Sequence, residues 1–235
     1  MKLYNSKLKG KSSDTDEGEE DFSNSGLKLF NNRLIVNRVE TYINENIGPV
    51  SMYTNLLHYG NSMEQHDQLT IYMDSNGGYL DSALAIIDMM ERTEGQVVVH
   101  ITGDAGSAAG IIALAAPNLI VGNRARMFCH AASYGMAGKQ GDVENMVNFN
   151  SKELKTLVKE VYHGFMQEEE IELMLLGRDY WMNKDEIVQR LENRAKLQQE
   201  EESAAMAVEE LAKEEARVAL LKPEAKPKRK ILRKK

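Results

Sequence analysis

The stretch QVVVHITGDAGSAAGIIALAA (residues 96–116) joins two kinds of local pattern. Its first part, QVVVHIT (96–102), is a β-branched run and predicts a buried strand. Its last part, GSAAGIIALAA (106–116), is apolar, too short to cross a bilayer, and predicts a buried helix. A strand that passes through a tight turn into a helix is a building unit of α/β folds.

The segments on both sides continue this alternation. Strands are predicted at 33–36, 38–43, 68–75, 118–122 and 125–131, and helices at 50–63 and 77–93. A long amphipathic helix is predicted at 143–165, another from Glu168 to Gly177, and a helical pattern runs from Lys184 to Pro223. The alternation predicts an α/β core with parallel strands and right-handed crossovers.

Composition narrows the class of protein. With 235 residues, 42% of them hydrophobic, the chain can bury one substantial core. A formal charge of −7 argues against a general nucleic-acid binder. The single cysteine, Cys129, excludes an internal disulfide and fits a reducing compartment. The sequence has no signal-peptide pattern and no membrane-spanning run, so we expect a cytoplasmic protein without membrane contact.

Charge and polarity divide the chain into four parts. Residues 1–26 are acidic and polar and predict a disordered extension, because they cannot bury enough apolar surface. Residues 27–194 form the predicted globular domain. Residues 195–222 predict a charged helical extension, and residues 223–235 a basic disordered tail.

Two turns made of small residues stand out, DSNGGYLDS (74–82) and GDAGSAAGI (103–111). Each connects a predicted strand to a predicted helix, the position where α/β sheets bind ligands with helix N–H groups. Ser107, at the start of the second helix, suits a nucleophile that faces an oxyanion site. Plain capping or close packing is the alternative for this serine.

A nucleophilic serine needs a base, and the chain offers five histidines. His100 lies inside an apolar strand, where a core histidine is the ordinary interpretation. His130 differs, because it closes a strand two elements after Ser107 and precedes two alanines. The residues alone therefore make Ser107 and His130 a candidate pair and leave structural roles open.

Four blocks carry a resemblance to a known family. They are DSNGGYLDSALAIIDMM (74–90), GDAGSAAGIIALAA (103–116), ARMFCHAA (125–132) and GRDYWMNKDE (177–186). In this order and spacing they resemble ClpP, the proteolytic subunit of the Clp protease, over residues 33–190. The resemblance implies a ClpP/crotonase-like fold of repeated β-β-α units, in which the helix at 143–165 is the protruding "handle" between rings.

The resemblance also assigns roles to residues. It implies that Ser107 is the nucleophile, His130 the general base and acid, and Asp179 the carboxylate that orients His130. The backbone N–H groups of Gly78 and Ala108 would form the oxyanion hole. The segment from Gly135 through Gly138 to Gly141 would pair with extended substrate, and neither a metal nor a cofactor is implied.

The implied function is that of a serine endopeptidase that hydrolyses peptide bonds in unfolded proteins or peptides through an acyl-enzyme. The resemblance implies a homo-oligomer of stacked heptameric rings and an AAA+ unfoldase as partner, with no membrane and no nucleic acid. Three alternatives stay open: a processing protease without an unfoldase, a crotonase-like thioester enzyme, and an inactive ring scaffold.

The sequence departs from the family pattern at three places. Asn76 stands where the family has a proline in its Ser-Pro-Gly-Gly turn, which a turn tolerates. IVQRLENRAKL (187–197) replaces an expected closing strand. The acidic segment before residue 27 does not resemble the family's axial loops, so docking of an unfoldase is not supported by the residues themselves.

Overall fold

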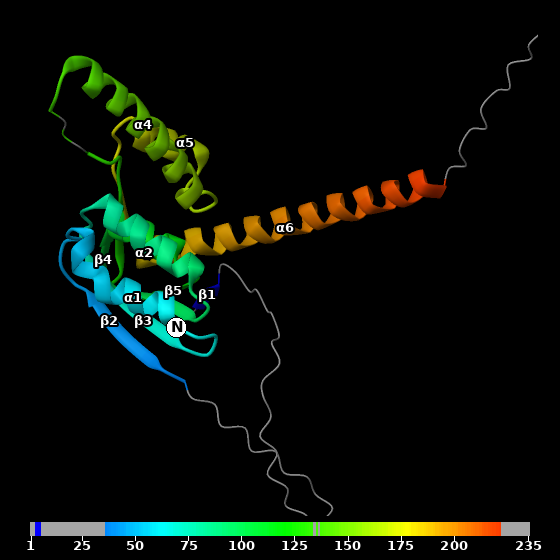
Figure 1. Ribbon diagram of the computed structural model, residues 1–235, viewed down its shortest axis with the longest axis horizontal. Helices are drawn as coiled ribbons and strands as arrows, with labels where there is room; N and C mark the ends of the chain where they lie inside the picture. The colour runs from blue at the N-terminus through cyan, green and yellow to red at the C-terminus, as the bar shows by residue number, and fades with distance from the viewer. Residues whose placement is uncertain (1–2, 6–35, 134, 136, 222–235) are drawn as a thin grey trace, which may run out of the picture. The chain divides into compact units, whose positions relative to one another are not determined.

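The computed structural model describes residues 3–5, 36–133, 135 and 137–221. Within these residues one sheet contains seven strands in the order β1-β5-β4-β3-β2, with β6 pairing with β4 and with β7 (Figure 1). The strands are β1 (Leu3–Asn5), β2 (Arg38–Ile43), β3 (Gln68–Ser75), β4 (Gln96–Gly106), β5 (Asn118–Val121), β6 (Arg126–Cys129) and β7 (Tyr180–Asn183). The pairings among β2 to β6 are parallel, as predicted. The added edges are antiparallel, β1 on β5 and β7 on β6.

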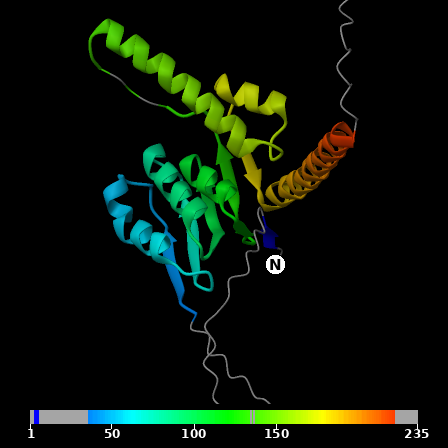
Figure 2. The same ribbon diagram turned by 45° about the vertical axis from the view of Figure 1, so that its right-hand side comes forward.

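Six α-helices are described: α1 (Thr54–Ser62), α2 (Leu80–Arg92), α3 (Ala108–Ala115), α4 (Gln140–Tyr162), α5 (Glu168–Leu175) and α6 (Lys184–Leu221). A short 3-10 turn, Val50–Tyr53, precedes α1. Figure 2 shows α4 and α5 together beside the end of the sheet where β6 and β7 lie. The α/β class predicted from the sequence is confirmed.

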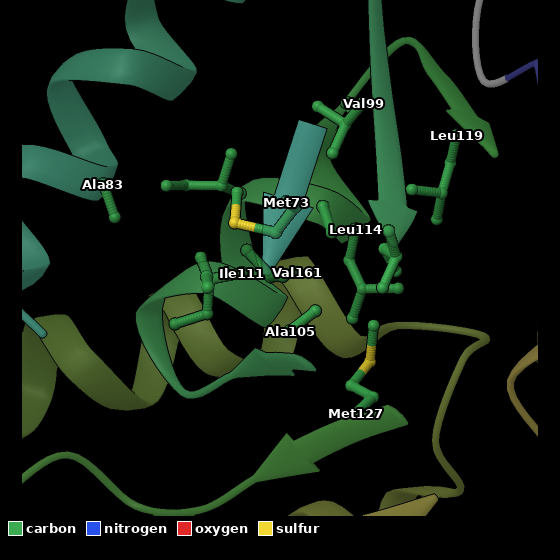
Figure 3. Close-up of a cluster of buried hydrophobic side chains, with 14 of the residues drawn as sticks. Met73, Ala83, Val99, Ala105, Ile111, Leu114, Leu119, Met127 and Val161 are labelled. Atoms are coloured by element: carbon green, nitrogen blue, oxygen red, sulfur yellow. The ribbon is translucent and has the colours of Figure 1, made fainter. Parts of the chain in front are cut away.

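The hydrophobic core is formed by side chains of β3 and β4 that point to the buried faces of the sheet. Leu69, Ile71 and Met73 on β3 are fully buried, as are Val97, Val99 and Ile101 on β4. Figure 3 shows Met73 and Val99 of the strands in one buried cluster with Ala83 of α2 and Ile111 of α3. Each fully buried side chain of this size contributes about 1.5–3 kcal/mol, so this layer fixes the sheet beneath the strand–helix turns.

The ends of several elements differ from the prediction. The helix predicted at 77–93 begins at Leu80, because Gly77 and Gly78 have φ values of 97° and 150°, outside the helical region. The strand predicted at 96–102 continues to Gly106, where it gains β6 as a partner. Residues 187–197 lie in α6, and Ile187 and Leu191 are buried, so a helix occupies the place of the expected closing strand.

The termini are described only in part. The predicted disordered segment 1–26 lies outside the described residues except for Leu3–Asn5, which form β1. This short strand differs from the prediction of disorder, since pairing with β5 satisfies its backbone groups. The basic tail at 223–235 and most of the strand predicted at 33–36 also lie outside the described residues.

The chain divides into two compact units, residues 1–195 and residues 196–235. The first unit contains the sheet, helices α1 to α5 and the beginning of α6. The described part of the second unit is the continuation of α6, whose side chains are exposed from Gln199 to Lys213. No helix among the described residues is both long enough and apolar enough to span a membrane.

Candidate active site

Ser107 lies in the turn between β4 and α3. Its φ of 51° and ψ of −122° make it the only non-glycine residue with a positive φ in the described part of the chain. Its N–H donates to the Phe128 carbonyl at 2.7 Å, which fixes the turn against β6. A serine in a backbone conformation suited to glycine is strained by about 1–3 kcal/mol, and such strain concentrates at functional sites.

The small residues around Ser107 allow two turns to approach each other. A Cβ on Gly77 would lie 2.7 Å from the Ser107 Cβ and 2.5 Å from the Gly106 carbonyl oxygen. A Cβ on Gly106 would lie 2.9 Å from the Asn76 carbonyl oxygen. The turn before α2 therefore packs directly on the turn before α3, and side chains larger than hydrogen at these glycines would separate them.

His130 follows β6 directly and meets Ser107. Its Nε2 lies 2.7 Å from the Ser107 Oγ, and both residues are half-buried. This distance permits either atom to act as donor, depending on the tautomer of the imidazole. The structure thus brings together the two residues that the sequence analysis selected as a candidate pair.

Asp179 lies immediately before β7, and its side chain is exposed. The β6–β7 register pairs Phe128 with Trp181 and Cys129 with Tyr180. Continued by one position, the same register places Asp179 opposite His130. Within the described residues, however, no hydrogen bond or ion pair joins the Asp179 carboxylate to His130.

The backbone N–H groups of Gly78 and Ala108, near Ser107, have no acceptor within the part of the chain that the structure describes. The Ile47 N–H donates to the Gly77 carbonyl at 2.8 Å, and the Tyr79 N–H donates to the Ile47 carbonyl at 2.9 Å, which leaves the intervening Gly78 N–H outside this ladder. Ala108 is the first residue of α3, where an N–H has no acceptor within the helix. Among the described residues neither N–H has a hydrogen-bond acceptor.

The three glycines assigned to substrate pairing do not share one conformation. Gly135 and Gly138 are exposed and lie outside helices and strands. Gly141 lies in the first turn of α4, which corrects the prediction that the loop extends from Gly135 to Gly141. The helix begins early because the Val143 N–H donates to the Lys139 carbonyl at 3.0 Å, and Asp142 complements the helix dipole.

Two aromatic residues belong to the site although the sequence analysis gave them no role. The Phe128 ring stacks on the His130 ring, with centroids 4.7 Å apart, and on the Trp181 ring, with centroids 4.0 Å apart. The alternation in ARMFCH (125–130) is the signal that could have found Phe128, because residues two apart on a strand share a face. Trp181 requires knowledge of the strand pairing.

Behind the site the polar groups are buried or paired. Burial raises the pKa of the Cys129 thiol to about 12, and it also raises the pKa of the neighbouring Tyr162. The Arg190 guanidinium donates to both carboxylate oxygens of Glu170, at 2.6 and 2.8 Å. These hydrogen bonds lower the pKa of the Glu170 carboxyl.

Fold and site together define an α/β protein with a serine–histidine pair at a strand–helix turn. Comparison with protein families adds a match of residues 17–190 to the Clp protease family. Since the match covers most of the 235 residues, the chain belongs to the Clp protease family.

Two curated relatives are similar to this chain over 139 residues. Both are named as an ATP-dependent Clp protease proteolytic subunit, one from Bacteroides thetaiotaomicron and one from Bacteroides fragilis. Each is 27% identical over 55% of this chain. The matched region spans 60% of the length of the first relative and 64% of the second.

Proposed function

We propose that this chain is a serine endopeptidase of the Clp type, in which Ser107 is the nucleophile and His130 the general base and acid. The observation that carries the proposal is the 2.7 Å contact between the Ser107 Oγ and the His130 Nε2. A nucleophile within hydrogen-bond reach of its base, at the amino end of a helix, is the arrangement that acyl transfer requires. Membership of the Clp protease family supports the same reaction.

In the proposed reaction, His130 takes the hydroxyl proton as Ser107 Oγ attacks the carbonyl carbon of a peptide bond. The oxyanion accepts hydrogen bonds from the Gly78 and Ala108 N–H groups, and their lack of acceptors among the described residues supports this role. His130 then donates the proton to the leaving amine, and water hydrolyses the acyl-enzyme. Asp179 orients His130 once a hydrogen bond forms across the β6–β7 pair.

The proposed substrates are unfolded proteins or peptides, bound extended beside Gly135 and Gly138. Gly141, in α4, would contribute only through the first turn of that helix. The exposed Met146 and Phe149, at 54% and 63% exposure on α4, support self-association in which this helix joins two stacked rings. The curated relatives are named as subunits of an ATP-dependent protease, and by analogy we include an AAA+ unfoldase as partner.

The test is labelling of the purified full chain with a fluorophosphonate, followed by peptide mapping. The reagent forms a phosphorus–oxygen bond with an activated serine, expels fluoride, and its reaction depends on the base that accepts the serine proton. We expect modification of Ser107 alone, none in Ser107→Ala, and much slower modification in His130→Ala. Asp179→Asn should slow peptide hydrolysis by about four orders of magnitude if Asp179 acts as the orienting carboxylate.

The exposed Asp179 without a hydrogen bond to His130 favours one second candidate, an inactive ring subunit that scaffolds active partners. Its signature would be a folded, assembled protein that the fluorophosphonate does not modify. Cleavage of protein substrates without any added ATPase would instead favour a processing protease that works without an unfoldase.

A further inference from the structure

Three aromatic rings stand in a row from the candidate base to solvent. The His130 and Phe128 rings are 26° from parallel, and the Phe128 and Trp181 rings are 25° from parallel. The Trp181 side chain is 71% exposed at the outer end of the row. Near-parallel rings at these separations have the geometry of favourable aromatic pairs.

Strand geometry produces this row. Phe128 and His130 are two residues apart, so their side chains leave β6 and its carboxyl end on the same face. Trp181 pairs with Phe128 in the antiparallel β6–β7 register. On the opposite side Phe128 pairs with Gly106, which adds no side chain. The partner for the Phe128 ring on this face therefore comes from β7.

The exposure of Trp181 argues against a role in the hydrophobic core. An indole that is 71% exposed gains little from burial, whereas Tyr162 and Phe165, which are buried in the described core, are at most 2% exposed. What Trp181 covers is the face of Phe128, and Phe128 in turn covers the face of the imidazole. The stacking contacts of Trp181 and Phe128 therefore connect Trp181 to His130 in the candidate site and not to the hydrophobic core.

We propose, on the basis of the proposed function, that Phe128 and Trp181 are positioning residues for His130. The stack restricts rotation of the imidazole and keeps its Nε2 at the Ser107 Oγ. The ring face of Phe128 also favours the imidazolium that forms when Ser107 loses its proton, because cations are attracted to aromatic faces. The Phe128–Trp181 pair further holds the register that places Asp179 opposite His130.

The experiment measures the concentration dependence of fluorophosphonate labelling, which separates the maximal rate of Ser107 modification, kinact, from the half-saturating concentration, KI. The variants are Trp181→Leu and Phe128→Leu, which keep apolar volume and lose the ring, and Trp181→Phe, which keeps a ring. Tyr42→Leu is the matched control, since Tyr42 is 63% exposed and stacks on Tyr72 at 4.9 Å on a distant part of the sheet.

We expect kinact to fall about three- to tenfold in each leucine variant, while KI stays unchanged. Trp181→Phe and the control Tyr42→Leu should keep a kinact near that of the wild type. A raised KI with unchanged kinact would overturn the proposal and make Trp181 a contact for the reagent or substrate. Unchanged kinetics in both leucine variants would also overturn it. Absence of Ser107 labelling in the wild type would count against the proposed function itself.

A second measurement needs no activity. Trp181 is the only tryptophan in the chain, so fluorescence reports this residue alone. If the row exists in solution, Phe128→Leu should raise the quenching of Trp181 by acrylamide while circular dichroism stays unchanged. Equal quenching in the wild type and the variant would show that Phe128 does not cover the indole and would overturn the proposal.

Discussion

Ser107 combines a backbone conformation that favours glycine with the hydroxyl on which the proposed chemistry depends. Its φ of 51° has a cost in folding free energy, whereas its contact with His130 provides the candidate nucleophile–base pair. At this residue stability and function are opposed. The opposition can be measured by changing the side chain and the backbone preference separately.

We predict opposite effects for two substitutions at this position. Ser107→Gly removes the strain of a positive φ and should raise the free energy of unfolding by about 1 kcal/mol, after the entropic cost of glycine is subtracted. Ser107→Ala keeps the strain and should change stability less. Both should abolish fluorophosphonate labelling. Urea unfolding followed by Trp181 fluorescence makes the comparison, and a Ser107→Gly variant less stable than Ser107→Ala would contradict it.

Cys129 provides a prediction about accessibility next to the candidate base. Burial raises the pKa of its thiol to about 12, so at pH 8 the folded protein presents neither an exposed sulfur nor a thiolate. We expect iodoacetamide to modify Cys129 only as fast as the protein opens. Labelling rates measured across urea concentrations should therefore follow unfolding, and rapid labelling of the native protein would be inconsistent with this packing.

At the scale of elements, α5 and α6 are joined by one well-formed ion pair. Glu170 is in the first turn of α5, where its carboxylate also accepts a hydrogen bond from the Gln167 N–H at 3.0 Å. Arg190, on α6, donates to the same carboxylate and to the Phe165 carbonyl. Both side chains of the pair are about three-quarters removed from solvent, at 22% and 24% exposure.

This pair predicts a dependence of stability on pH. The pKa of Glu170 is lowered in the folded protein from its ordinary value of 4.5, chiefly by the Arg190 hydrogen bonds. The stabilisation is therefore fully present above pH 4.5 and is lost as the pH falls through the lowered folded-state pKa. Glu170→Gln should cost about 1 kcal/mol at pH 7, discounted for solvent screening, and nothing at strongly acidic pH.

Glu168→Gln is the matched control on the same helix. Glu168 pairs with Lys159, but the Glu168 side chain is 60% exposed, so removal of its charge should change stability less than removal of the charge of Glu170. Urea unfolding at a series of pH values compares the two variants. An equal loss of unfolding free energy in both variants at pH 7 would indicate that burial of the Glu170–Arg190 pair does not increase its contribution to stability.

The elements show what the sequence could predict. The β-branched run at 96–102 and the helical spacing at 77–93 are local patterns, and both elements formed with shifted ends. The strand β7 was not predicted, because Tyr180–Asn183 is short and becomes a strand only through pairing with β6. Its absence from the prediction is also why Trp181 had no role, since the row of rings depends on non-local pairing.

The candidate site was predictable to the same degree. Ser107 and His130 stood out as residues in special local contexts, and the structure places them in contact. Asp179 had no local signal and entered only through resemblance to a family. The early start of α4, which takes Gly141 out of the loop, depends on the Lys139 carbonyl and Asp142. The three glycines of this segment had led to the prediction of a longer loop.

For the whole molecule, the division after Ala195 predicts the results of truncation. Ile187 and Leu191 are 0% and 6% exposed, and each contributes about 1.5–3 kcal/mol to folding. From Gln199 to Lys213 every side chain of α6 is exposed. A protein ending at Ala195 should keep the unfolding midpoint of the full chain, and one ending at Glu186 should unfold far more easily.

Thermal unfolding followed by Trp181 fluorescence measures both truncations. The protein ending at Ala195 should also retain Ser107 labelling, because Trp181 is the last residue of the candidate site along the chain. A large loss of stability on removal of residues 196–235 would mean that the two units depend on each other for folding.

The position of β4 in the sheet has a consequence for the order of events during synthesis. Ser107 follows β4 and His130 follows β6, with only α3, β5 and β6 between them, so their contact closes a short loop of chain. Asp179 and Trp181 follow only after α4 and α5 have been made. Because chains fold from the amino terminus as they emerge, the serine–histidine pair can assemble on the ribosome well before Asp179, the proposed orienting carboxylate, and Trp181 have been made. A nascent chain would then hold the proposed nucleophile and base while still lacking β7, the strand that carries Trp181.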